Sequence, residues 1–337
     1  MSREVGERAI DFALDAAVAR GEPLEIELFG GEPLLEWELV VDLATLARRR
    51  ASERGVPLVL QMTTNGTLLD DERVKVLGEL EVHLALSLDG TQKAHDQARP
   101  NVGGAGSYRL ASAALDRLLA AGRPFDVITV VDPATVTELA RGVRETLDRG
   151  VSQLTLNANW AGAWTDAALE SMRLAYEEVA AILVAWFRRG RAVSIQPFDS
   201  ALVTFASSGS VRPHGCSAGV SSLAVGPSGR VYGCARSVGE DEAERAIGAI
   251  DAGLDPARVA VLGSPACPGS CACANLEETG DASTPGHVQR FHDALVASLA
   301  PKIARALERD AVGLSTYLSA FAPERAAPSV LEALEVS

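Results

Sequence analysis

Five cysteines, all of them after residue 215, are the side chains in this sequence best suited to hold a metal. They are Cys216, Cys234, Cys267, Cys271 and Cys273. Clustered thiols in a reducing compartment indicate metal or redox chemistry before disulfides. The surrounding residues 207–285 are rich in Gly, Ser and Pro, so a metal staple would help them fold. Four thiolates suit an iron–sulfur cluster or a structural zinc ion, and thiols without a metal are the third alternative.

Three polar strings in the first 100 residues are the other candidates for chemistry. They are Gly30-Gly31-Glu32-Pro33, Asn65-Gly66-Thr67, and Asp89-Gly90 followed by His95-Asp96 and Arg99. Paired glycines let backbone N–H and C=O groups approach a ligand closely, and the proline fixes the exit of the chain. Taken singly, each string is typical of an ordinary turn. In order at three successive strand ends, they predict one ligand site.

Alternating helix and strand patterns predict the elements that position these strings. We expect helices over 3–19, 36–53, 70–80, 107–121, 166–189, 286–309 and 312–322, and strands over 24–29, 57–64, 82–88, 125–131 and 152–158. The strands read as mostly continuous apolar runs, which are typical of a parallel sheet covered by helices. Repeated units of ~30 residues predict right-handed crossovers and an α/β barrel or an open doubly wound sheet. The chain opens on a helix, with no strand before it.

Charge and hydropathy exclude two classes of partner. The net charge is −14, and the one notable basic run, 48–50, is typical of a solvated helix face, so we expect no nucleic-acid binding. No apolar run approaches the ~18–20 residues that cross a bilayer. The start MSREVGERAID is charged and helical rather than signal-like. We therefore expect a cytoplasmic protein without a membrane partner.

The three strings resemble the radical SAM (S-adenosylmethionine) superfamily, particularly its SPASM-containing branch of peptide and protein modifiers. They read LFGGEPLL (28–35), TTNGTLL (63–69) and SLDGTQKAHDQAR (87–99). The resemblance implies a partial (β/α)6 TIM-like barrel. It also implies a SAM site formed by Gly30, Gly31, Glu32 and Pro33, with Thr63 and Asn65 lining the cleft, Ser87 near the methionine carboxylate or ribose, and Arg99 as a charged contact.

The cysteines carry a second resemblance. Gly229 lies five positions before Cys234 and allows a tight hairpin that returns Cys234 towards Cys216. This spacing is similar to the opening of SPASM and twitch domains, which hold auxiliary [4Fe–4S] clusters. Five thiols allow one fully thiolate-ligated cluster, with Cys267 or Cys271 joining the other ligands. The implied domains are a barrel over 1–190, a SPASM/twitch-like domain over 191–285 and a helical segment over 286–337.

One departure from the family pattern concerns the catalytic cluster. The family holds it on C-x3-C-x2-C after the first strand, and residues 1–215 contain no cysteine. We expect a chain that is truncated or incomplete, with weak or absent SAM binding. The alternative is a pseudoenzyme that acts as a peptide-binding or partner subunit. A missing first strand would expose the edge of the strand over 24–29, so we expect self-association or a partner subunit there.

The resemblance implies a lineage that modifies peptide or protein side chains by hydrogen-atom abstraction. Ala235 stands where sulfatase-maturing relatives commonly have Asp, which disfavours formylglycine formation and favours peptide maturation. His95, Asp96 and Asp199 are possible acid–base groups, but loop positions more often serve as caps, so none is assigned as catalytic. An unrelated α/β protein with a zinc-stapled tail is the remaining alternative.

Overall fold

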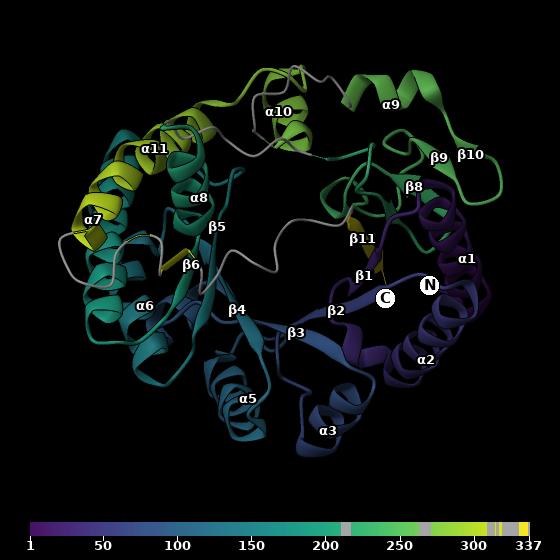
Figure 1. Cartoon of the computed structure of the whole chain (residues 1–337), viewed down its shortest axis with the longest axis horizontal. Helices are drawn as coiled ribbons and strands as arrows, with labels where there is room; N and C mark the ends of the chain where they lie inside the picture. The colour runs from purple at the N-terminus through teal and green to yellow at the C-terminus, as the bar shows by residue number, and fades with distance from the viewer. Residues whose placement is uncertain (210–216, 263–270, 309–313, 315–316, 319–329, 336–337) are drawn as a thin grey trace.

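Six parallel strands in sequence order form the main sheet of the protein, which we describe from a computed structural model. The structure describes residues 1–209, 217–262, 271–308, 314, 317–318 and, for the backbone, 330–335. The strands are β1 (Leu24–Phe29), β2 (Leu58–Thr64), β3 (Val82–Ser87), β4 (Phe125–Val131), β5 (Gln153–Ala158) and β6 (Ser194–Gln196). They curve around a centre (Figure 1), so the expectation of an α/β fold with a parallel sheet and a partial barrel is confirmed.

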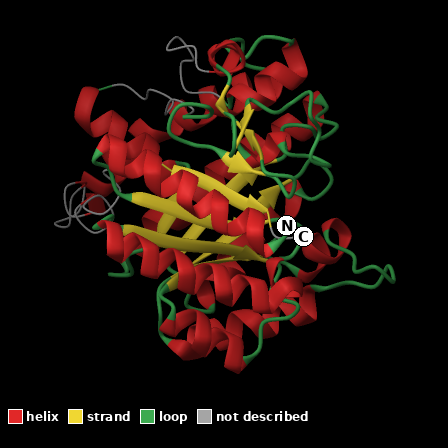
Figure 2. Ribbon diagram, turned by 90° about the vertical axis from the view of Figure 1, so that its right-hand side faces the viewer, coloured by secondary structure: helices red, strands yellow, loops and turns green. Residues whose placement is uncertain are grey.

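Helices cover the outer face of this sheet, as Figures 1 and 2 show. They are α1 (Arg3–Arg20), α2 (Trp37–Arg54), α3 (Asp71–Glu79), α4 (Gln92–Ala98), α5 (Tyr108–Ala121), α6 (Leu139–Asp148) and α7 (Asp166–Arg188). The helix α8 (Phe198–Ser208) and the long α11 (His287–Glu308) pack with α7 on one side. The first helix shows why the chain folds this way locally. Ser2 caps α1 by accepting from the Val5 amide at 3.2 Å, and Gly21 ends it in the left-handed conformation.

The strands alternate in polarity, which corrects the expectation of continuous apolar runs. Their helix-facing residues are apolar and buried, for example Leu24, Ile26 and Leu28 in β1. The other residues point to the inside of the barrel and are mostly half-buried. We call them the lumen face: Glu25, Glu27, Phe29, Val59, Gln61, Thr63, His83, Ala85, Ser87, Asp126, Ile128, Val130, Gln153, Thr155 and Asn157. The outer face of this sheet is buried under the helices, and its side chains are therefore mostly apolar.

The edge of β1 is not open, contrary to the expectation from the sequence. The segment β11 (Val330–Glu335) pairs parallel with β1, with Glu25 opposite Val330 and Phe29 opposite Glu335. Strand β11 also pairs with β7 at Leu334 and Val225. The sequence prediction placed only helix after residue 286. It missed a strand whose backbone groups satisfy those of β1.

The C-terminal part adds a small hairpin sheet to the barrel. It contains β7 (Ala224–Val225), β8 (Arg230–Tyr232), β9 (Gly248–Ala249), β10 (Gly253–Leu254), and the helices α9 (Pro256–Leu262) and α10 (Ala272–Thr279). Strand β6 extends the parallel sheet of the barrel beyond residue 190. The predicted boundary between the barrel and the SPASM/twitch-like domain at that residue stays a prediction. The expected helix over 312–322 falls mostly outside the described residues. Within the described part, no helix combines the length and apolar character needed to cross a bilayer.

Candidate functional site

Glu32 ties the loops after β1 and β2 together at the carboxyl ends of the strands. Its side chain is buried, with 7% exposed. The carboxylate accepts hydrogen bonds from Leu34 N at 3.1 Å, Thr64 Oγ1 at 2.8 Å and Asn65 N at 2.7 Å. The side chain therefore serves the protein framework and leaves the loop backbone for a ligand.

The paired glycines before Glu32 supply that backbone. Gly31 is exposed, and a side chain placed there would meet no atom within 4 Å. Gly30 has a φ of 155°, which side chains rarely adopt. Pro33 is buried at the start of the short 3-10 helix η1 (Pro33–Glu36). A closely approaching ligand would find open space at Gly31, and Pro33 fixes the path of the chain after the loop.

The glycines in the other two strings are explained by packing. Gly66 has a φ of 74°, and a Cβ there would lie 2.6 Å from Leu86 Cδ1 and 2.8 Å from Ala114 Cβ. Gly90 has a φ of 72°, and a Cβ there would lie 2.4 Å from Gly142 Cα. Any larger residue would push these loops off the neighbouring helices α5 and α6.

Three of the predicted cofactor residues lie at the carboxyl ends of the strands β2 and β3. Thr63 Oγ1 donates to Glu27 Oε1 at 2.6 Å. Ser87 is 9% exposed, and its hydroxyl makes no hydrogen bond to the described residues. Asn65 lies in the turn after β2, where its Oδ1 accepts from Thr67 N at 2.9 Å. Thr63 and Asn65 thus each have a side-chain oxygen engaged, whereas the Ser87 hydroxyl has no partner within the described structure.

Arg99 is held by a buried carboxylate. Its guanidinium donates to both oxygens of Asp89, at 2.7 and 3.2 Å, and Asp89 also accepts from Val130 N at 2.9 Å. Asp89 is 5% exposed and follows the end of β3. The pair fixes the loop after β3 against β4, so the structure gives Arg99 a framework contact.

His95, one of the possible acid–base groups, completes that framework. The Asp89 amide donates to His95 Nδ1 at 3.3 Å, so Nε2 carries the proton and donates to Ser107 Oγ at 3.0 Å. Ser107 in turn donates to the Arg99 carbonyl at 2.6 Å. Burial lowers the pKa of His95 against the opposing pull of Asp89, and Arg99 lowers it further.

The other two possible acid–base groups also hold elements together. Asp96 accepts from the Tyr108 amide at 2.8 Å, which joins α4 to α5. Asp199 is buried and accepts from Ser194 Oγ and from the Tyr317 hydroxyl. These contacts are typical of caps and clamps.

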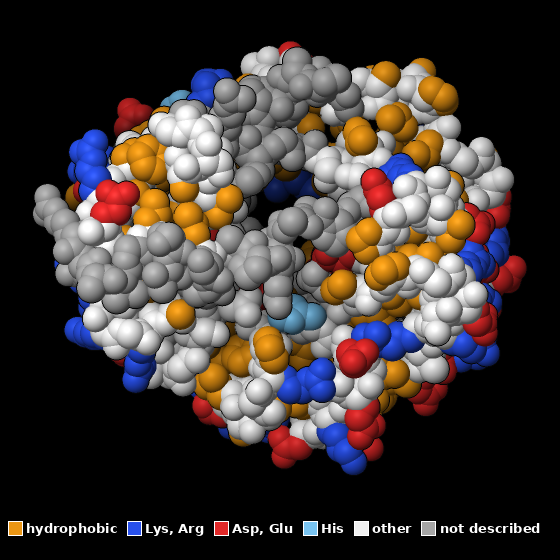
Figure 3. Space-filling model, in the orientation of Figure 1, with side chains coloured by type: hydrophobic (Ala, Val, Ile, Leu, Met, Phe, Trp, Pro, Cys, Tyr) orange, Lys and Arg blue, Asp and Glu red, His pale blue; other side chains and the backbone are white. Residues whose placement is uncertain are grey.

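A histidine–aspartate pair on the lumen face was not predicted from the sequence. His83 Nε2 and Asp126 Oδ2 lie 2.7 Å apart, and the Gln61 amide beside His83 donates to Glu25. The signal that could have found them is the alternation of residues in VHLALS and FDVITVV, which places every second residue on one face of a strand. Figure 3 shows a hollow at the centre of the molecule, in the region that the strands surround.

The described cysteines converge in the C-terminal part. The expected hairpin is present, with Ala224 opposite Tyr232 across β7 and β8 and Gly229 at a φ of 84°. Cys234 follows it, and its Sγ lies 3.1 Å from Cys273 Sγ, too far for a disulfide of about 2.05 Å. This contact, together with burial, raises the pKa of Cys273.

Two of the five predicted ligands lie outside the described residues, namely Cys216 and Cys267. Cys271 is half-buried at the start of α10, two residues before Cys273. The described residues do not gather three potential metal ligands at one point. The donor chemistry of the two converging thiols nevertheless fits an iron–sulfur cluster or zinc.

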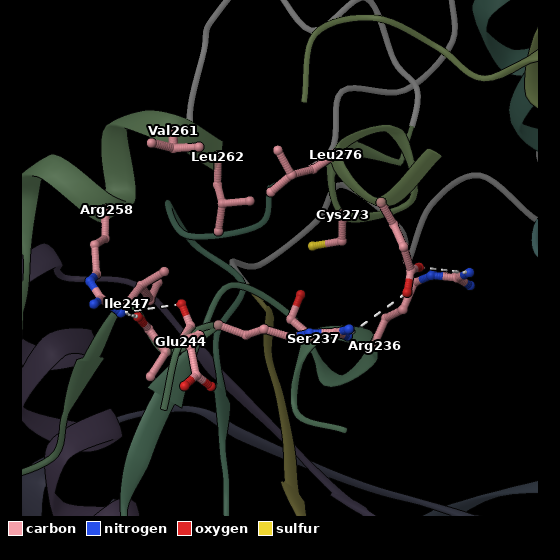
Figure 4. A pocket seen from close by; sticks show the side chains of 12 residues that line it. Arg236, Ser237, Glu244, Ile247, Arg258, Val261, Leu262, Cys273 and Leu276 are labelled. Atoms are coloured by element: carbon pink, nitrogen blue, oxygen red, sulfur yellow. Dashed lines mark hydrogen bonds and ion pairs between the residues drawn. The ribbon is translucent and has the colours of Figure 1, made fainter. Parts of the chain in front are cut away.

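A cavity of about 330 Å³ lies beside Cys273, whose sulfur points towards it (Figure 4). Apolar side chains such as Leu262 and Leu276 line one side, and arginines line the other. The arginines are engaged: Arg236 lies 3.5 Å from Glu277, and Arg258 donates to the Ala246 carbonyl at 2.6 Å. The cavity leaves room for a group held by the cysteines.

Comparison with known proteins identifies the barrel. Residues 3–144 match the family model of the radical SAM superfamily. Residues 3–144 are a radical SAM domain. These residues contain all three polar strings, so the resemblance based on them is confirmed.

One curated relative of this chain is a maturase by name. The chain is 25% identical over 322 residues to the serine-type anaerobic sulfatase-maturating enzyme of Klebsiella aerogenes, covering 87% of this chain and 76% of that enzyme. Among solved structures, it is similar to native anSMEcpe with bound AdoMet, with a TM-score of 0.65 and 20% identity over 77% of this chain and 71% of that one. It is also similar to native anSMEcpe with bound AdoMet and Kp18Cys peptide, with a TM-score of 0.62 and 20% identity over 77% and 72%. At these identities the solved structures show a shared fold.

Proposed function

We propose that this radical SAM chain belongs to a lineage of peptide or protein side-chain maturases and receives a peptide side chain in its barrel lumen. The observation that carries the proposal is the polar lumen face, framed by strands of a radical SAM domain. A neighbour of the same fold is solved with AdoMet and a peptide. The Gly30–Pro33 loop, with Thr63, Asn65 and Ser87, is the proposed SAM cleft, and Arg99 supports it through Asp89.

The C-terminal cysteines are proposed to hold one auxiliary [4Fe–4S] cluster. Cys234 and Cys273 are its firmest ligands, joined by Cys216 and by Cys267 or Cys271. The convergence of two thiols beside a cavity supports this assignment. A cluster there would supply one-electron chemistry next to the barrel, and zinc would supply structure alone.

Radical generation is proposed to require a part that these 337 residues lack. Cleavage of SAM in this family uses a cluster on C-x3-C-x2-C, and no cysteine precedes Cys216. The second candidate function is therefore a peptide-binding or partner subunit that uses the same lumen without making the radical. The lumen face is common to both candidate functions.

Iron and acid-labile sulfide analysis after anaerobic reconstitution tests the auxiliary cluster. We expect about four irons per chain, as one [4Fe–4S] cluster requires. Cys234→Ser and Cys273→Ser should each remove the iron. Either Cys267→Ser or Cys271→Ser should leave it in place and serve as the matched thiol control. Zinc in place of iron, or iron that both C234S and C273S retain, would contradict the assignment.

Titrations with SAM and with the Kp18Cys peptide test the peptide-binding lumen that the two candidate functions share. Saturable peptide binding with weak SAM binding supports a lumen that binds peptide without its catalytic cluster. Tight SAM binding would contradict the proposal that this chain lacks the SAM-chelating iron. A chain that binds no peptide would contradict both functions.

A further inference from the structure

We propose that His83 is the proton-accepting group of the barrel lumen and that Asp126 positions it. The inference rests on the proposed function, because it gives the peptide in that lumen a partner for one of its O–H, N–H or S–H groups. His83 is the second residue of β3 and Asp126 the second residue of β4. Neither belongs to the loops assigned to SAM or to the cysteine site.

The hydrogen bond between the two side chains fixes the tautomer of the histidine. Asp126 Oδ2 lies 2.7 Å from His83 Nε2. A carboxylate only accepts, so Nε2 carries the hydrogen and Nδ1 keeps its lone pair. Nδ1 makes no hydrogen bond to the described residues. The same division of roles, a carboxylate on one nitrogen and an open acceptor on the other, defines a general base.

The pair lies where a ligand could reach it. The His83 side chain is 29% exposed although β3 is an inner strand, between β2 and β4. Its neighbour on the lumen face is Gln61, which donates to Glu25. Besides His83, the charged groups of the lumen face are Glu25, Glu27 and Asp126, and β1–β6 place no Lys or Arg there.

A purely structural role fits the pair poorly. The second carboxylate oxygen, Asp126 Oδ1, is buried and accepts no hydrogen bond from the described residues. Cross-strand polar pairs that only hold a sheet together normally satisfy their buried atoms. The two buried histidines of the described structure show the contrast. His95 uses both ring nitrogens, and His292 bonds Tyr176 at 3.1 Å and Asp293 at 3.4 Å.

The proposed step is a simple proton transfer. The X–H bond of the peptide group breaks, an Nδ1–H bond forms, and the electron pair stays on X. The imidazolium that results is stabilised by Asp126 through the bond at 2.7 Å. The step needs no oxidant, so it is independent of how the radical is made.

Ring nitrogen NMR of 15N-histidine-labelled protein tests the positioning role of Asp126. We expect a single Nε2–H tautomer for His83, assigned by its loss in His83→Gln. Asp126→Asn should give a tautomer mixture, since an amide can donate as well as accept. Asp116→Asn, which removes a surface carboxylate paired with Arg149, is the matched control and should change nothing at His83. A wild-type Nδ1–H tautomer, or one unaffected by D126N, would overturn the inference.

Modification with diethyl pyrocarbonate tests whether His83 Nδ1 is unprotonated and whether it faces the bound peptide. The reagent attacks unprotonated imidazole nitrogens, so His83 should react while His95 and His292 do not. Bound Kp18Cys peptide should abolish the His83 reaction. If the peptide binds but leaves His83 reactive, or if His83 never reacts, the inference fails and peptide binding stands. If no peptide binds while His83 reacts, the proposed function fails instead.

Discussion

At the scale of single residues, two buried carboxylates, those of Glu32 and Asp89, hold the loops of the proposed SAM site. The Glu32 carboxylate accepts from two backbone amides and a hydroxyl, and it thereby joins the loops after β1 and β2. The buried Asp89–Arg99 pair does the same for the loop after β3. The motif side chains thus hold the loops, and the exposed backbone of Gly31 is left for a ligand.

Replacing Glu32 should destabilise the whole barrel. Glu32→Ala leaves three donors without an acceptor, and we expect the free energy of unfolding to fall by about 2–4 kcal/mol. Glu32→Gln keeps one acceptor oxygen and should lose less. Urea denaturation followed by circular dichroism measures the effect, and exposed Glu38→Gln is the matched control. A loss in E32A no larger than in E38Q would contradict the framework role.

His95 should make stability depend on pH. Its pKa is lowered in the folded protein, so the unfolded chain binds the proton more readily. The stabilising contribution of neutral His95 is present above about pH 6.5, the ordinary pKa of histidine, and is lost as pH falls below it. The difference in unfolding free energy between wild type and His95→Asn should therefore shrink from pH 7.5 to pH 5. A difference that stays constant over this range would exclude the effect.

At the scale of elements, β11 completes the sheet. A strand at the end of a sheet exposes a row of unpaired N–H and C=O groups, and β11 pairs with those of β1 by parallel pairing. Through its contact with β7 it also joins the hairpins of the cysteine region to the barrel, which gives one sheet of 11 strands. The edge of β1 is therefore a place where the two parts of the chain meet.

Removing β11 should make the chain associate. Deletion of residues 330–337 would expose β1, whose edge can then pair with another copy, and the apparent mass in size-exclusion chromatography with light scattering should rise. Deletion of 336–337 alone, which keeps β11, is the control. If the longer deletion keeps the apparent mass and the melting temperature of the full chain, β11 does not protect that edge.

The sequence could predict the strands β1–β5 and the helices α1, α2, α3, α5 and α7 to within a few residues, because capping residues and periodicity are local signals. It did not predict α4, and it placed His95 and Asp96 in a loop. It predicted the β7–β8 hairpin from Gly229. It could not predict β11, because pairing with β1 joins residues about 300 positions apart by backbone groups that every residue has. His83 and Asp126 were missed because a lumen pair becomes visible only when the register of two strands is known.

At the scale of the whole molecule, the barrel and the cysteine region each supply part of the proposed function. The barrel offers a mostly polar, half-buried lumen face, and the cysteine region offers two converging thiols beside a cavity. A metal held there would link the hairpin, through Cys234, to α10, through Cys273. Binding that occurs only in the folded state stabilises that state.

Metal binding should therefore raise the melting temperature of the full chain. We expect the reconstituted wild type to melt several degrees above its metal-free form, because the metal joins segments with little apolar core between them. C273S should show no such difference, which calorimetry of the four samples would establish. An equal rise in C273S would place the metal elsewhere.

The central claim, that a peptide enters the lumen, is tested most directly by comparing two valine substitutions. Val59 lies on the lumen face and is 42% exposed, and Val18 lies on the outer helix α1 and is 52% exposed. Val59→Trp should fill part of the lumen and abolish binding of the Kp18Cys peptide in a fluorescence anisotropy titration. Val18→Trp should bind it as the wild type does. Equal binding by both variants would contradict the account.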